Sequence, residues 1–185
     1  TPVGLMEPLT GQPSDTTYGL TPAFPSIATL MRTAGYETAL VGKWHLGSRR
    51  QHSPTKNGFD YFFGIRSGAA DYISHNGVTG VHDLFENDSA AYCEGYLTDL
   101  ITVKAIEFIR KKHGKPFFLS INFNAPHWPW QKPGDPPYAN SSNFREGGSP
   151  VIYAQMMKSL DDGIGEIMKT LDNQDLAANT IIIFT

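Results

Sequence analysis

The order of helical and strand patterns along the chain constrains the fold more than any other feature. Three stretches repeat apolar residues every three to four positions and predict helices: 27–34, about 95–112 and about 151–171. A short apolar run follows each of them and predicts three strands: 36–41, 116–123 and 181–184. Helices that alternate with strands are typical of crossover units in a parallel sheet. We therefore expect an α/β fold with a mostly parallel sheet flanked by helices.

Local signals mark the helix ends and the buried helix faces. Ser26 can cap the first helix, and Gly35 follows its last turn. The third helix is expected to bury one apolar face: Met156, Met157, Leu160, Ile164, Ile167, Met168 and Leu171. Asp161 and Asp162 are neighbours in this helix and point in different directions. We interpret them as a solvated face and not as a metal site.

The segments between these elements read as loops. Residues 1–25 and 125–150 are rich in Pro and Gly and show no periodicity. Residues 47–95 also read as mostly irregular, with turn signals around an aromatic cluster: Phe59, Tyr61, Phe62 and Phe63.

The composition excludes several classes of protein. A chain of 185 residues suffices for one α/β domain, and its 12% aromatic content rules out a disordered polar chain. The net charge of −3 argues against nucleic-acid binding through phosphate contacts. No apolar run approaches the roughly 20 residues that span a bilayer. The single cysteine, Cys93, excludes an internal disulfide framework and a cysteine zinc site.

Basic side chains follow two of the predicted strands. Lys43 and His45 come after the strand at 36–41, and His127 comes after the strand at 116–123. Ligands bind beyond the carboxyl ends of parallel strands, so these segments should share one edge and one pocket. A lysine with two imidazoles suits an oxyanion, because lysine supplies charge and histidine can donate or transfer a proton. The alternatives are a solvated lysine, a structural histidine and a surface histidine.

Four segments resemble the sulfatase family, over roughly residue 20 to the end of the chain. The segment from Gly35 to Gly47, which ends in Gly-Lys-Trp-His-Leu-Gly, matches a signature of that family at nearly every position. Three others are similar to later family segments: Asn57–Gly64, Ala125–Pro129 and Ile181–Thr185.

The resemblance implies an alkaline-phosphatase-like α/β fold and the hydrolysis of sulfate esters. It also implies a formylglycine nucleophile made from a cysteine, and a divalent cation, usually calcium. By this match, Lys43 holds the nucleophile and the sulfate oxygens. His45 contacts a formylglycine hydroxyl and assists elimination of sulfate, and His127 binds sulfate and helps to protonate the leaving oxygen.

The sequence departs from the family pattern at the nucleophile and at the metal ligands. No Cys-x-Pro-Ser-Arg or Cys-x-Ala-Ser-Arg motif occurs, and Cys93 reads as a small apolar residue near a helix start. The family's paired aspartates and its Asp-Asn pair are also absent. We therefore expect residues 1–185 to be part of a catalytic domain, an internal fragment incomplete at both ends. The calcium ligands and the formylglycine would lie outside this chain, to which we assign no metal ligand.

Two alternatives to a sulfatase remain open. One is a phosphodiesterase or phosphonate monoester hydrolase of the same superfamily, and the other is a fragment that is inactive by itself. The expected partner is a small-molecule or carbohydrate sulfate ester, with no nucleic acid and no membrane span. The family implies a periplasmic, secreted or lysosomal location.

Several further residues have two readings. Trp128 and Trp130 could stack on a sugar or aryl group, or could pack the loop, and we count Trp128 as substrate-binding. His75, His82 and Asp83 could line a substrate pocket or serve the structure. Asn87 and Asn140 begin triplets that match the glycosylation sequon, a pattern that often arises by chance.

Overall fold

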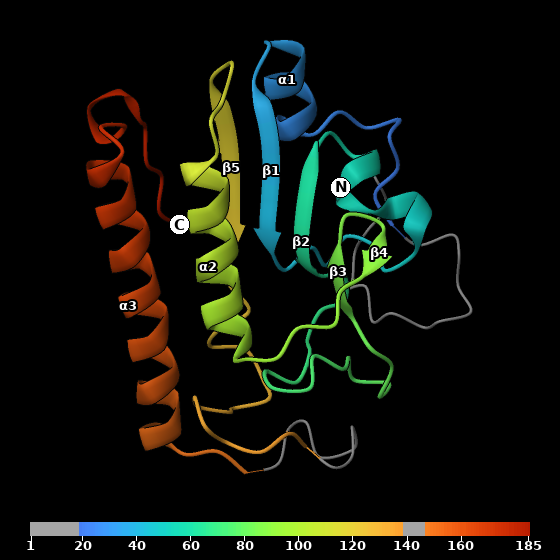
Figure 1. Ribbon diagram of the computed structural model, residues 1–185. Coiled ribbons are helices and arrows are strands. Elements are labelled where there is room, and N and C mark those ends of the chain that lie inside the picture. The colour runs from blue at the N-terminus through green and yellow to red at the C-terminus, as the bar shows by residue number, and fades with distance from the viewer. Residues whose placement is uncertain (1–18, 139–146) are drawn as a thin grey trace.

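The computed structural model describes residues 19–138 and 147–185. Within them, five strands form one sheet in the order β4-β3-β2-β1-β5 (Figure 1). The strands are β1 (Glu37–Gly42), β2 (Tyr61–Ile65), β3 (Leu84–Glu86), β4 (Ser89–Ala90) and β5 (Phe117–Asn122). Strand β1 is central and pairs in parallel with β2 and β5, whereas β3 and β4 are antiparallel. The predicted mostly parallel sheet is confirmed.

In the described part of the chain, three α-helices accompany the sheet: α1 (Ile27–Thr33), α2 (Leu97–Arg110) and α3 (Pro150–Asn173). Short 3₁₀ turns are η1 (Arg50–His52), η2 (Pro54–Lys56) and η4 (Ala177–Asn179). The Ser26 hydroxyl accepts a hydrogen bond from the Thr29 backbone N–H, and Gly35 has a positive φ of 91° after α1. Both predicted ends of the first helix are confirmed. Figure 1 shows α2 lying over β1 and β5, with α3 packed along the outer side of α2.

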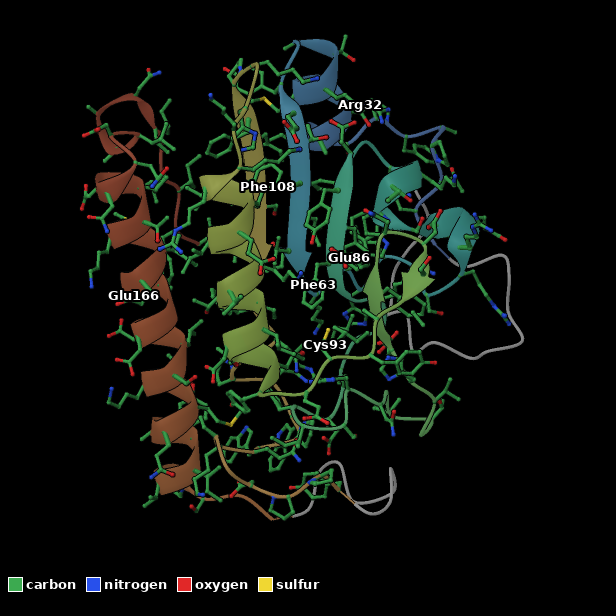
Figure 2. All side chains as sticks on the ribbon, viewed as in Figure 1. Arg32, Phe63, Glu86, Cys93, Phe108 and Glu166 are labelled. Atoms are coloured by element: carbon green, nitrogen blue, oxygen red, sulfur yellow. The ribbon has the colours of Figure 1, made fainter. Side chains whose placement is uncertain are left out.

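The sheet separates two apolar clusters, because successive residues of a strand point to opposite faces. Val41 and Phe63 belong to the main cluster, which also contains Leu97 and Ile101 of α2 (Figure 2 labels Phe63). Leu40 and its neighbours on the other face form the second cluster: Ala28, Leu40, Trp44, Phe59 and Phe62. Both faces of β1 are therefore buried, as in a parallel sheet covered on two sides.

Residues 47–95 are mostly irregular, as predicted, but the sequence did not reveal the strands that this segment contains. Strand β2 begins three residues after the Asn57-Gly58 turn and pairs with β1, so three residues of the aromatic cluster (Tyr61, Phe62 and Phe63) lie in a mostly buried strand. The antiparallel hairpin β3–β4 extends the same sheet. The apolar run in β2 is continuous and lacks the alternation of apolar and polar residues that marks a half-buried strand. A search for periodicity therefore did not detect β2.

Two expectations for the last forty residues are also wrong. Ile181–Phe184 forms no strand, and its four side chains are 51–91% exposed. A β-branched run becomes a strand only where a neighbouring strand accepts its backbone hydrogen bonds, and no described strand does so. In α3, Met157 and Met168 are exposed, because the buried stripe runs through Met156, Gly163, Ile167 and Leu171.

None of the helices in the described part of the chain is long and apolar enough to cross a membrane.

Candidate functional site

The carboxyl ends of β1 and β5 meet at one edge of the sheet. Gly42 lies opposite Asn122 in the parallel ladder. The Lys43 backbone N–H then donates to the Asn122 carbonyl (2.7 Å), and the Asn122 side-chain amide donates to the Lys43 carbonyl (3.1 Å). The two segments predicted to carry the site therefore leave the sheet side by side. That Lys43, His45 and His127 share one pocket stays a prediction.

Glycine is required where these strands converge. A Cβ atom on Gly42 would lie 2.0 Å from the Asn122 carbonyl oxygen, and Gly42 has a φ of +120°. A Cβ atom on Gly64 of β2 would lie 1.8 Å from the Gly42 carbonyl oxygen. Only a residue without a side chain permits this approach. The pair of glycines thus brings β1, β2 and β5 close together just before Lys43.

Lys43 is a partly buried cation without a counter-ion. No carboxylate of residues 19–138 and 147–185 lies within 4 Å of its ammonium group. Burial lowers the pKa of Lys43, because the charged form is partly removed from water. A half-buried charge without a partner is costly, and a bound anion would compensate it.

His45 has a left-handed backbone conformation with φ of 57°. Its N–H donates to the Arg66 carbonyl at the end of β2 (3.2 Å), and its ring lies against Gly68, where a Cβ atom would be 2.4 Å from Nε2. Left-handed conformations are uncommon outside glycine and cluster at functional sites. The three-residue turn from Arg66 to Gly68 therefore supports the His45 ring.

Asp83 holds that turn in place, which the sequence did not reveal. Its carboxylate accepts hydrogen bonds from the N–H groups of Arg66 (3.3 Å) and Ser67 (3.0 Å) and from the Ser67 hydroxyl. Asp83 is only 7% exposed, and burial raises its pKa against the opposing effect of these hydrogen bonds and of the Arg66 charge. Asp83 thus positions the support beneath His45.

His127 lies on the exposed loop after β5. Its N–H donates to the Asn124 carbonyl (2.9 Å), and the Tyr72 hydroxyl donates to its carbonyl (3.0 Å). Its Nδ1 lies 2.8 Å from the Trp128 carbonyl, which can only accept, so Nδ1 carries a proton. Nε2 has no hydrogen-bond partner among the described residues. In the neutral ring, Nε2 is therefore the atom that can accept a proton.

The loop after His127 carries the two tryptophans. Cis peptide bonds precede Pro126 and Pro129, on either side of His127. Trp128 and Trp130 stack face to face with ring centroids 4.5 Å apart.

The two remaining histidine candidates serve the structure. His75 is 1% exposed, and its Nε2 lies 3.0 Å from the Gly95 carbonyl. Burial lowers its pKa, an effect that His82 reinforces and that Gly95 and Asp71 oppose. His82 bonds the Ala91 carbonyl (2.8 Å). These contacts do not support the alternative that His75 and His82 line a substrate pocket.

Other candidates are resolved in the same way. Asp162 pairs with Lys158 on the exposed side of α3, which confirms a solvated face. Cys93 packs partly buried against the main apolar cluster (Figure 2). Asn87 lies between β3 and β4, where its side-chain oxygen accepts from the Phe62 N–H (3.0 Å). Asn140 lies outside the described residues.

No cluster of three or more His, Cys, Asp or Glu side chains in residues 19–138 and 147–185 could hold a metal ion. A hollow of about 580 Å³ lies between α2 and α3, and neither Lys43 nor either candidate catalytic histidine lines it.

Comparison with known proteins shows the family of the chain. The sulfatase family model matches residues 2–185. Arylsulfatase J of Mus musculus is 36% identical over 171 residues, which are 84% of this chain and 27% of the relative. N-acetylgalactosamine-6-sulfatase of Mus musculus is 33% identical over 170 residues, which are 84% of this chain and 31% of the relative. The chain thus spans less than a third of either relative.

A solved structure shares the fold. The crystal structure of Ps i-CgsB in complex with k-i-k-neocarrahexaose matches 95% of this chain and 42% of its own, with 25% identity and a TM-score of 0.72. The chain therefore has the alkaline-phosphatase-like α/β fold. It belongs to the sulfatase family.

Proposed function

We propose that the protein containing this chain hydrolyses sulfate esters, and that residues 1–185 form part of its catalytic domain. The observation that carries the proposal is the half-buried Lys43 ammonium without a counter-ion, just beyond the converging ends of β1 and β5. A sulfate group supplies the negative charge that this position lacks. The identity with named sulfatases supports the same conclusion.

Each of the three basic residues has a role that fits its surroundings. Lys43 would bind a sulfate oxygen and stabilise the charge that develops during hydrolysis. With Nδ1–H held by the Trp128 carbonyl, His127 would act as the imidazolium, whose Nε2–H would bind a sulfate oxygen and then pass its proton to the leaving oxygen. His45, fixed above Gly68, would assist the release of sulfate.

The family also implies a calcium ion and a formylglycine, which supply charge neutralisation and a nucleophile when present. The described residues do not fit either group. They include no metal-binding cluster, and Cys93 lacks the surrounding motif and packs against the core. The steps assigned above therefore involve only Lys43, His45 and His127.

For the substrate, we propose a small-molecule or carbohydrate sulfate ester. N-acetylgalactosamine-6-sulfatase acts, by its name, on a sulfated sugar, and Ps i-CgsB was crystallised with an oligosaccharide. We also propose a periplasmic, secreted or lysosomal location, as is implied by the family resemblance.

The test is an assay of the full-length protein and its variants with aryl and sugar sulfates. Lys43→Ala and His127→Ala should each lower kcat/KM by about 100-fold or more, the size expected for loss of a charge or a general acid. Lys112→Ala is the matched control, because Lys112 is exposed beyond the end of α2. Unchanged sulfate turnover in both site variants would refute the proposal. Faster turnover of phosphate or phosphonate esters would favour a phosphoryl-transfer enzyme of the same superfamily.

A further inference from the structure

The loop after His127 carries a stack of aromatic rings. The indoles of Trp128 and Trp130 are parallel, with an interplanar angle of 0° and centroids 4.5 Å apart. On α3, the Tyr153 ring lies 5.2 Å from the Trp130 ring and is tilted by 59°. The loop and the helix thus form one aromatic unit.

The two tryptophans differ in how they are anchored. Trp130 packs against the main apolar cluster, and a Cβ atom on Gly148 would lie 2.8 Å from its ring. Trp128 is half-buried and belongs to neither apolar cluster. Because Trp130 covers one face of Trp128, the exposed part of Trp128 is its other face and its edges. Trp130 therefore joins the Trp128 ring to the core and holds it in place.

The indole N–H groups of Trp128 and Trp130 are available to a ligand. Neither indole N–H donates to any described residue, and neither is a buried unsatisfied donor. Trp128 directly follows His127, and its carbonyl fixes the His127 ring (2.8 Å). The position of Trp128 is thus fixed relative to the His127 side chain, which would bind the sulfate.

We propose that Trp128 is a stacking platform for the sugar ring of a sulfated carbohydrate whose sulfate group reaches His127. This inference rests on the proposed function and narrows it to sulfated sugars. One face of a pyranose consists of C–H groups with partial positive charge, and the indole face is negative. The sugar hydroxyls can accept a hydrogen bond from the Trp128 indole N–H, whereas an aryl ring offers only its π face, a weak acceptor.

The openness of the platform also favours a sugar. A pyranose keeps several hydroxyl groups hydrated while one face is stacked, so a single half-exposed ring suits it. An aryl group gains most from an enclosed apolar slot that covers both of its faces. Because Trp130 already covers one face of Trp128, at most one face of the ring is left for a ligand.

The experiment is an NMR titration of the ¹⁵N-labelled chain, whose indole signals come from Trp44, Trp128 and Trp130. The probes are N-acetylgalactosamine 6-sulfate, glucose 6-sulfate, N-acetylgalactosamine and inorganic sulfate. A sulfated sugar should shift both Trp128 and His127, the unsulfated sugar only Trp128, and inorganic sulfate only His127. Trp44 is the internal control, because it is buried and its N–H donates to the His52 carbonyl (2.8 Å).

Two variants separate stacking from loop packing. Trp128→Ala should weaken sulfated-sugar binding by about fivefold, the effect of losing one favourable ring stack, and leave the affinity for inorganic sulfate unchanged. Trp128→Phe keeps a flat ring and should restore most of the sugar affinity. An unchanged affinity in Trp128→Ala would overturn the platform.

The outcomes also distinguish this inference from the proposed function. If inorganic sulfate shifts His127 but no sugar shifts Trp128, the platform is wrong and the proposed function stands. If inorganic sulfate leaves His127 unmoved while N-acetylgalactosamine shifts Trp128, the platform stands and the sulfate site is wrong.

Discussion

Replacing Asp83 by asparagine tests how the turn beneath His45 is held. The carboxylate of Asp83 accepts three hydrogen bonds from Arg66 and Ser67. An asparagine of the same shape has only one acceptor oxygen, so at least one of the backbone N–H groups loses its acceptor and faces an NH₂ group. A buried donor without an acceptor costs about 1–3 kcal/mol.

A second effect opposes this loss. The raised pKa of Asp83 means that burial penalises the charged carboxylate by more than its hydrogen bonds and the Arg66 charge compensate. A neutral amide avoids that penalty. We therefore expect Asp83→Asn to lower the free energy of unfolding by about 1–2 kcal/mol at pH 7, at the low end for a lost buried hydrogen-bond network.

Urea unfolding measures the stability, and NMR signals of the His45 ring measure the local effect. Asp60→Asn is the matched control, since Asp60 accepts from the backbone N–H and the hydroxyl of Thr38 at the opposite end of β1. The control should lose some stability and leave the His45 signals in place, whereas Asp83→Asn should move them. A stability within about 0.5 kcal/mol of wild type, together with unmoved His45 signals, would refute the positioning role of Asp83.

Three further predictions address the sheet edge, the pH dependence and α3. Gly42→Ala should lower the stability measured by thermal unfolding by more than about 3 kcal/mol, because its Cβ would lie 2.0 Å from a backbone oxygen of β5. Gly114 has open space around it, so the control Gly114→Ala should change the stability by less than about 0.5 kcal/mol. Equal effects of the two substitutions would contradict the close approach of β1 and β5. Burial lowers the pKa of His75 below its ordinary 6.5, so the unfolded chain binds the proton first and stability should fall below about pH 6.5, by at most about 1.4 kcal/mol per pH unit. Urea titrations at pH 7.5 and 5.5 should show a smaller loss for His75→Asn than for wild type, and equal losses would exclude His75. Ile167→Ala should cost about 2–4 kcal/mol and Met168→Ala less than about 1 kcal/mol in urea unfolding, since only Ile167 faces the core; the reverse order would place the buried stripe of α3 wrongly.

The sequence predicted those elements whose signals are local. Ser26 and Gly35 mark the ends of α1 because capping is a contact between neighbouring residues. Strand β2 was missed because it is defined by a partner that is distant in the sequence. It pairs with β1, whose residues lie twenty-two positions earlier in the chain, and the contact between Thr38 and Asp60 spans the same distance. The exposed run at Ile181–Phe184 shows the converse, in which strand propensity finds no described partner.

For the candidate site, the rule that ligands bind beyond parallel strands correctly placed the chain segments after β1 and β5 at one edge, where Lys43 contacts Asn122. Position along the chain could not show that Asp83 holds the turn under His45, because that contact joins two loops. The sequence also could not show that Trp130 packs against the main apolar cluster and that Trp128 stacks on the Trp130 ring.

The pairing of β1 with β5 also sets an order in time. Lys43 and the Asn122 amide that bonds its carbonyl are 79 residues apart in the chain. A ribosome adds about 5–20 residues each second, so Lys43 waits several seconds before its partner strand exists. Closing so long a loop is slow relative to local helix formation. During synthesis, α1 can form early, while the edge that carries Lys43 is assembled only after β5 leaves the exit tunnel.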